Sequence, residues 1–236
     1  MKIFYALIIL TALYISFLFV RIRFTLHTAD LPNIVQADEL MGQGPHLKYI
    51  AAGDSTAVGE GASSVQQSYT YRIARHLSES HIVEYRNVGM LGAKTEDVIE
   101  KQLPSIIEFQ PDVVTISVGA NDVTHLRKNS HTLKNINTIL KTLTKETNAQ
   151  IYLTVIPVVD QAMLLPYPVR RLWGYKAKNL NPQILALEND RVHVIDIYNF
   201  GWENYPDIQT TFAQDQFHPN DTGYDNWTKA FLSKIQ

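Results

Sequence analysis

Residues 112–118 read Asp-Val-Val-Thr-Ile-Ser-Val (DVVTISV), a run in which nearly every side chain is apolar or β-branched. A strand that is covered by helices on both faces has this character, whereas a strand with one wet face alternates apolar and polar residues. Pro111 stands before the run, and Pro157 follows the next β-rich run, so both mark element boundaries. The run therefore predicts a central strand of a parallel sheet.

On both sides of this strand, short β-rich runs alternate with longer stretches of helical pattern. This alternation is typical of βαβ units and predicts an α/β fold with a mainly parallel, five-stranded sheet in a single domain, 47–236. The predicted strands are 47–52, 82–87, 112–118, 150–156 and 192–196, and the predicted helices are 69–80, 95–109, 131–147, 176–189 and 222–235.

The composition narrows the possible functions. Of the 236 residues, 45% are hydrophobic and 19% are charged, which is typical of a globular protein. The net charge is −2 and there is no Lys/Arg-rich run, so we expect no nucleic-acid partner. There is no cysteine, and the eight histidines show no zinc-binding spacing. We therefore expect neither a metal nor a cofactor.

The N-terminal segment has the length and composition of a membrane helix. Residues 3–20 carry no charge, and Lys2, Arg21 and Arg23 flank them. We expect residues 1–23 to form a single membrane anchor or an uncleaved signal, with 24–46 as a spacer. A cleaved signal peptide is the alternative, although the apolar run is longer than is usual for one. We expect the domain on the extracytoplasmic side of a cell membrane, or secreted if cleavage occurs.

Polar residues follow several predicted strands. Gly53-Asp54-Ser55 follows the first strand, 87–92 (NVGMLG) the second, and 119–122 (GAND) the third, while 215–220 (DQFHPN) precedes the last helix. In an open α/β sheet, ligands bind beyond the carboxyl ends of the strands. We therefore expect these four segments to meet at one edge of the sheet.

The residue types in these segments match the needs of acyl transfer, which requires a nucleophile, a base, a group that orients the base, and donors for an oxyanion. Ser55 is the candidate nucleophile, His218 the base and Asp215 the orienting carboxylate. The candidate oxyanion donors are the backbone N–H groups of Ser55 and Gly92 and the carboxamide of Asn121. Gly89 is an alternative to Gly92.

Together these segments resemble the sequence blocks of the SGNH, or GDSL-type, esterase and lipase family. Its Ser, Gly, Asn and His correspond to Ser55, Gly92, Asn121 and His218, with Asp215 three residues before the histidine. The resemblance implies a three-layer α/β/α, flavodoxin-like fold without a metal. It also implies hydrolysis of carboxylic esters of lipids, acetylated sugars or small alcohols. We therefore expect a small-molecule ester or an ester of the cell envelope, a lipid or an acetylated glycan, as the substrate.

Other interpretations remain open at this point. Each segment taken alone is an ordinary turn or loop sequence, and only their joint occurrence predicts a site. An acyltransferase would use the same residues, and a non-catalytic module could bind a glycan or a partner in the same cleft. Asp54 and Asp122 are expected to have structural roles. The segment 158–175 is expected either to line an acyl pocket or lid, or to connect two elements over the core.

Overall fold

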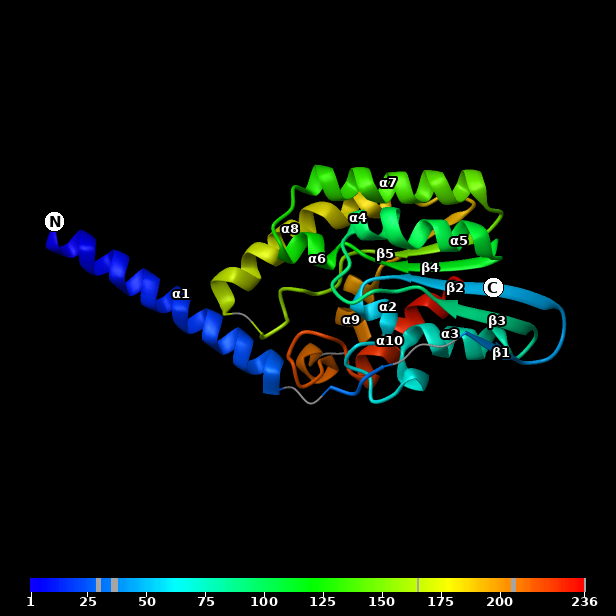
Figure 1. Ribbon diagram of the computed structural model, residues 1–236, viewed down its shortest axis with the longest axis horizontal. Helices are drawn as coiled ribbons and strands as arrows, with labels where there is room; N and C mark the ends of the chain where they lie inside the picture. Colours follow the sequence, from blue (N-terminus) through cyan, green and yellow to red (C-terminus); the bar gives the residue numbers. More distant parts are fainter. Residues whose placement is uncertain (29–30, 35–37, 165, 205–206, 236) are drawn as a thin grey trace.

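The computed structural model describes residues 1–28, 31–34, 38–164, 166–204 and 207–235 (Figure 1). A six-stranded sheet with the order β1-β3-β2-β4-β5-β6 forms the centre of the domain. All neighbouring strands pair in parallel except β1, which is antiparallel to β3. The strands are β1 (Glu39–Met41), β2 (His46–Gly53), β3 (Ile82–Asn87), β4 (Val113–Ser117), β5 (Gln150–Thr154) and β6 (Val192–Ile195).

Helices cover both faces of the sheet, so the α/β/α layering is confirmed (Figure 1). On one face α3 (Tyr69–Leu77), α9 (Ile197–Asn204) and α10 (Asp221–Leu232) pack together. On the other face α5 (Leu103–Phe109), α7 (Asn129–Glu146) and α8 (Tyr167–Leu185) pack together. Short helices α2 (Ser55–Val58), α4 (Thr95–Asp97) and α6 (Ala120–Thr124) follow strands β2, β3 and β4.

The strand β4 has the central position predicted from its sequence. All five of its residues are buried, and it lies between β2 and β5. Buried aromatic rings pack between the helices of one layer; Tyr69 on α3, for example, stacks on Phe231 on α10 with ring centroids 5.0 Å apart. The polar segments predicted to form the site follow the carboxyl ends of strands β2, β3 and β4.

Two sequence predictions about the elements need correction. The sheet has a sixth strand, because Glu39–Met41, within the predicted spacer, pairs with β3 at the sheet edge. Helix α8 begins at Tyr167 rather than at residue 176. Pro168 lies in its first turn, where a missing N–H costs no helical hydrogen bond, so this proline starts the helix instead of preventing it. Parts of the predicted spacer, 29–30 and 35–37, lie outside the described residues.

The N-terminal helix α1 (Lys2–Thr28) extends away from the domain (Figure 1). Its window Ile3–Arg21 has a mean hydropathy of 2.5 and none of it is buried against the rest of the protein. By length and composition this helix can cross a membrane, and a signal sequence would share these properties.

Candidate active site

Ser55 stands at the sharp turn between β2 and α2. The turn depends on Gly53, whose φ is +132° and where an added Cβ would lie 1.9 Å from the carbonyl oxygen of Ser117. Asp54 then caps α2, because its Oδ1 accepts hydrogen bonds from the Thr56 N–H at 2.9 Å and the Thr56 hydroxyl at 2.7 Å. Ser55 is thus the first residue of a helix, held at the carboxyl edge of the sheet.

Gln102 is a positioning residue that the sequence did not reveal. Its Oε1 accepts from the Gly53 N–H and its Nε2 donates to the Gly53 C=O, both at 2.8 Å. The side chain is buried and comes from a π-helical turn, Val98–Gln102. Since the partner lies 49 residues away in the sequence, no local pattern indicates this contact.

His218 meets Ser55 from the other end of the sequence. The Ser55 Oγ and the His218 Nε2 are 2.8 Å apart, and the His218 Nδ1 and the Asp215 Oδ2 are 2.5 Å apart. Because Asp215 accepts the proton of Nδ1, Nε2 is left to accept the proton of the serine hydroxyl. The three residues therefore form a continuous chain of hydrogen bonds from carboxylate to hydroxyl.

A tight turn holds Asp215 and His218 together. Gln216, between them, has a φ of +60°, and the Oδ1 of Asp215 accepts the N–H groups of Phe217 and His218 at 3.0 Å each. Burial raises the pKa of Asp215, but the hydrogen bonds and charge of His218 and these N–H groups outweigh it, so the pKa lies below its ordinary value. The carboxylate is therefore charged at neutral pH.

Asp54 and Asp122 are both hydrogen-bonded within the fold, but only Asp54 has the predicted local partner, because the partner of Asp122, Thr95, is 27 residues away in the sequence. Asp122 accepts from the Thr95 hydroxyl at 2.8 Å and the Thr95 N–H at 3.0 Å, which ties the turn after β3 to α6. Burial raises the pKa of Asp54 to about 6, although the hydrogen bonds from Thr56 act in the opposite direction. Neither carboxylate is bonded to His218.

The turn after β3 brings Gly92 to the same site. Gly92 has a φ of +71° and lines a groove together with Ser55 and His218. The alternative, Gly89, already donates its N–H to the Asn87 Oδ1 at 2.9 Å. Its N–H is therefore engaged within the turn, and Gly92 is the better placed of the two to donate to a ligand.

Asn121, in the first turn of α6, lines the same groove. Its Nδ2 donates one hydrogen bond to the Ala93 carbonyl at 3.0 Å, which fixes the carboxamide. A carboxamide nitrogen carries two hydrogens, so a second one is available for a ligand. The structure thus brings together all of the sequence-predicted site residues, from four separate segments.

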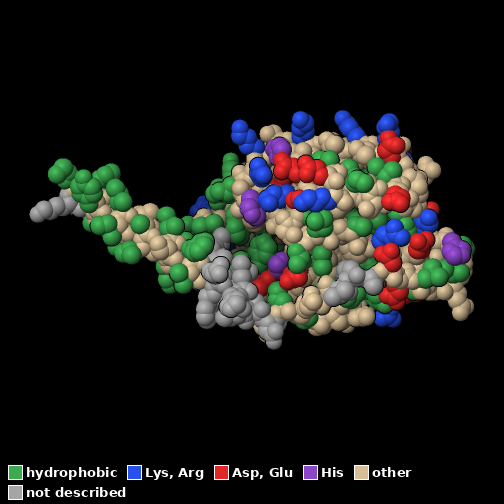
Figure 2. Space-filling view, in the orientation of Figure 1, with side chains coloured by type: hydrophobic (Ala, Val, Ile, Leu, Met, Phe, Trp, Pro, Cys, Tyr) green, Lys and Arg blue, Asp and Glu red, His purple; other side chains and the backbone are tan. Residues whose placement is uncertain are grey.

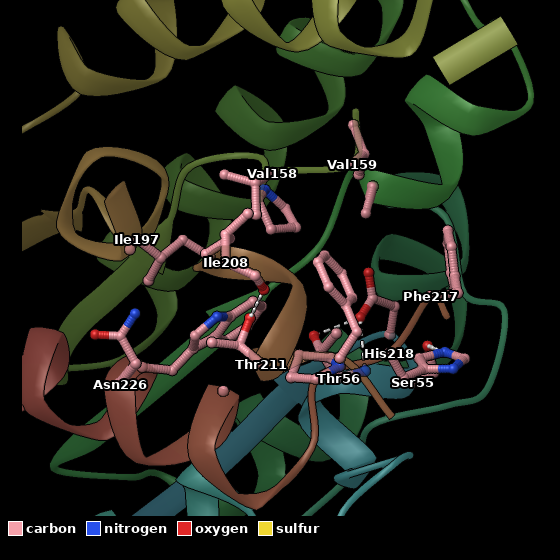
Figure 3. A pocket seen from close by; sticks show the side chains of 18 of the residues that line it. Ser55, Thr56, Val158, Val159, Ile197, Ile208, Thr211, Phe217, His218 and Asn226 are labelled. Carbon is pink, nitrogen blue, oxygen red and sulfur yellow. Dashed lines mark hydrogen bonds between the residues drawn. The ribbon is translucent and has the colours of Figure 1, made fainter. Parts of the chain in front are cut away.

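Two hollows meet at Ser55. An open groove of about 470 Å³ contains Ser55, Gly92, Asn121 and His218. A narrower cavity of about 50 Å³ extends behind Ser55, and in Figure 3 Val158, Ile197 and Ile208 lie across it from Ser55 and His218. The segment 158–175 contributes to both, with Val158 and Val159 in the cavity and Leu164 and Trp173 in the groove. Of the two roles expected for this segment, it therefore has the first, because it lines both hollows beside Ser55.

The described residues hold no group of three or more His, Asp or Glu side chains placed for a metal ion. The site consists instead of one hydroxyl, one imidazole, one carboxylate and several N–H donors, a set suited to acyl transfer.

Comparisons with known proteins agree with this arrangement. The fold is similar to a lipase, Lip_vut3, from a goat rumen metagenome (24% identity, TM-score 0.62, covering 79% of this chain and 96% of that chain). It is also similar to the acetylxylan esterase Axe2 of Geobacillus stearothermophilus (18% identity, TM-score 0.60, covering 83% and 98%). A lipase/acylhydrolase from Enterococcus faecalis is a third (22% identity, TM-score 0.61, covering 80% and 95%).

A comparison with curated protein sequences gave no match. The model of the GDSL-like lipase/acylhydrolase family, in contrast, matches residues 51–225, most of the chain. The segment includes Ser55, Gly92, Asn121, Asp215 and His218. The chain therefore belongs to the GDSL-like lipase/acylhydrolase family, and it is a hydrolase of ester bonds.

Proposed function

We propose that this chain is a serine esterase in which Ser55 is the nucleophile, His218 the general base and Asp215 the residue that orients His218. The observation that carries the proposal is the hydrogen-bond chain from Asp215 through His218 to Ser55, with distances of 2.5 and 2.8 Å. Residues 163 positions apart in the sequence form the Ser55–His218 contact, so local chain geometry does not account for it.

The proposed reaction has two steps. Ser55 Oγ attacks the ester carbonyl carbon while His218 Nε2 takes the hydroxyl proton; the tetrahedral intermediate then expels the alcohol, which His218 protonates. Water next attacks the acyl-Ser55 ester, again with His218 as base, and the released Ser55 regains its proton. Asp215, charged and buried, stabilises the imidazolium in both steps.

Three donors are proposed to stabilise the negative oxygen of the intermediate. They are the backbone N–H groups of Ser55 and Gly92 and the second N–H of the Asn121 carboxamide. The Ser55 N–H begins helix α2, so it has no helical acceptor, and it has no other among the described residues. Preorganised donors of this kind contribute much of the rate enhancement in acyl transfer.

We propose that the substrate is an ester of the cell envelope, either a lipid or an acetylated glycan, and that α1 holds the enzyme in a cell membrane with the domain on the extracytoplasmic side. The length and hydropathy of α1 support the anchor. The fold similarity to lipases and to an acetylxylan esterase supports both substrate classes.

The proposal is tested by hydrolysis of p-nitrophenyl acetate by the purified full chain in detergent. Ser55→Ala and His218→Ala are each expected to abolish turnover, whereas Ser80→Ala, in the loop before β3, leaves it unchanged. Undiminished hydrolysis by Ser55→Ala would show that the nucleophile lies elsewhere. Addition of alcohol acceptors to the same assay separates hydrolysis from acyl transfer, since a transferase would form the new ester in preference to the free acid.

A further inference from the structure

In the described part of the domain that follows α1, most of the exposed large hydrophobic side chains lie around the active-site groove. Outside α1, those that the structure describes as exposed are Leu40 on β1 and a set on segments that line or adjoin the groove: Leu91, Leu126, Met163, Tyr167, Leu172 and Tyr175. Leu91 itself lines the groove, and the others come from stretches that contribute His125, Leu164 or Trp173 to it. An apolar rim of this kind marks an interaction surface.

Positive charge accompanies this rim. The sequence from Gln161 to Leu187 contains four cationic side chains and no acidic one. Arg171 and Lys178 are exposed and have no acidic partner within the described ranges. Lys128 lies nearby, because the Lys176 Nζ bonds to the Arg127 carbonyl at 2.6 Å, although Arg127 itself pairs with Glu96 at 3.5 Å. Asp160 lies in the same surface hollow, but it is partly buried beneath Gly174.

The combination of exposed hydrophobic and basic side chains distinguishes this surface from helix α7. Helix α7 also presents exposed lysines, such as Lys134 and Lys141, but it presents no exposed large hydrophobic side chain. In Figure 2, hydrophobic and basic side chains meet at the end of the domain from which α1 extends. The same end contains the beginning of α8 (Figure 1).

We propose that this surface, which we call the docking rim (Leu91, Leu126, Met163, Tyr167, Arg171, Leu172, Tyr175 and Lys178), lies on an anionic phospholipid bilayer. Tyr and Leu side chains enter the boundary between head groups and acyl chains, while Arg and Lys bind lipid phosphates. A bilayer is favoured over a protein partner because α1, in the same chain, has the composition of a membrane helix. The contact places the mouth of the groove against the lipid.

The consequence for catalysis rests on the proposed function: esters embedded in the bilayer reach Ser55 without passing through water. The docking itself is independent of the catalytic assignments. It depends only on the exposed side chains and on the sign of their charge.

The chain has no cysteine, so a single introduced cysteine carries the only thiol label. Full-length protein with Leu172→Cys and an environment-sensitive fluorophore is reconstituted into phosphatidylcholine vesicles with or without phosphatidylglycerol. Quenching by a nitroxide-labelled lipid is then measured. The comparison label is at Lys145→Cys, in the last turn of α7 and shortly before the amino end of β5, whereas the groove lies beyond the carboxyl ends of the strands. We expect strong quenching at position 172 with phosphatidylglycerol and little at position 145.

Charge reversal supplies the matched control. Arg171→Glu with Lys178→Glu is expected to lower the ratio of docked to undocked domain more than about twentyfold, since one cation accounts for about fivefold at an anionic surface. Lys134→Glu with Lys141→Glu makes the same change in net charge on α7 and should leave quenching unchanged.

Equal quenching at positions 172 and 145, equal quenching with and without phosphatidylglycerol, or equal effects of the two charge reversals would each overturn the proposal. Hydrolysis of p-nitrophenyl acetate, which is soluble, should be unchanged in both charge-reversed proteins and shows that they fold. If Ser55→Ala retained activity while position 172 was still quenched, the docking would stand and the catalytic assignment would fail.

Discussion

The side chain of Gln102 binds both polar groups of the Gly53 backbone, accepting from its N–H and donating to its C=O at 2.8 Å each. Gly53 is two residues before Ser55, and its backbone already has a conformation that favours glycine. A side chain from the π-helical turn Val98–Gln102 therefore fixes the turn that presents the proposed nucleophile.

Replacement of this side chain should affect both stability and catalysis. Gln102→Leu leaves the buried N–H and C=O of Gly53 without these partners, so we expect the free energy of unfolding to fall by about 1–3 kcal/mol. We also expect kcat to fall with KM nearly unchanged, because the position of Ser55 changes while the groove does not. Denaturant unfolding and steady-state kinetics check this. Gln183→Leu, on the exposed face of α8, is the control, and an unaltered kcat in folded Gln102→Leu would contradict a positioning role.

The buried Asp54 should make stability depend on pH. Its pKa is raised to about 6 in the folded protein, whereas an unfolded aspartate ionises near pH 3.9. The folded state is thus favoured while the group is protonated, and this contribution is lost as the pH rises from about 4 to about 6. A shift of about two units corresponds to roughly 3 kcal/mol.

Asp54→Asn removes this titration and retains an acceptor for the Thr56 N–H. As the pH rises from about 4 to about 7, the unsubstituted protein should therefore lose roughly 3 kcal/mol of unfolding free energy relative to Asp54→Asn. Denaturant titrations at several pH values measure this difference, with Asp190→Asn at an exposed position as the control. A pH-independent difference would contradict the raised pKa.

Two glycines of the site should respond differently to alanine. An added Cβ at Gly53 would lie 1.9 Å from the Ser117 carbonyl oxygen, whereas at Gly92 it would find no heavy atom within 4 Å. In Gly92→Ala the free energy of unfolding should then fall by only about 1–2 kcal/mol, because alanine is strained in a left-handed backbone conformation. Gly53→Ala should prevent normal folding. Thermal unfolding followed by circular dichroism compares them, and similar melting temperatures would contradict this account of the turn.

The Asn121 carboxamide should contribute to turnover more than to binding. Removal of one oxyanion donor typically lowers kcat by ~10²–10³. We expect Asn121→Ala to show a loss of this size with a smaller change in KM, since the donor acts on charge that develops during the reaction. Asn137→Ala, on α7, should leave both constants unchanged. A loss confined to KM would indicate that Asn121 serves only in substrate binding.

Much of the fold was predictable because its signals are local. The apolar run of β4 and the alternation of β-rich and helical stretches gave five strands and the order of the layers. Strand β1 was missed because three residues at a sheet edge, Glu39–Met41, have no periodicity of their own. The start of α8 was missed because Pro166, Pro168 and Gly174 are breakers in most contexts. The helix nonetheless begins directly after Pro166 and includes Pro168 and Gly174, with Trp173 and Ala177 buried in the core.

The residues of the candidate site were predictable for a different reason. The carboxyl ends of parallel strands share one edge, so Ser55, Gly92 and Asn121 were expected to meet once the strands were recognised. Gln102 was not predictable, because its role comes from a contact between distant segments. The docking rim was not predictable either, since exposure of Leu172 or Tyr175 depends on which face of α8 the core covers.

The central claim is that His218 and Asp215 activate Ser55, and covalent labelling by a fluorophosphonate tests it most directly. The account predicts that mass spectrometry finds one label per chain, on the peptide containing Ser55. It also predicts that labelling is lost in Ser55→Ala and strongly slowed in His218→Ala, while Ser80→Ala is labelled as fast as the unsubstituted protein. Labelling of another residue, or labelling of Ser55 at an undiminished rate in His218→Ala, would contradict the account.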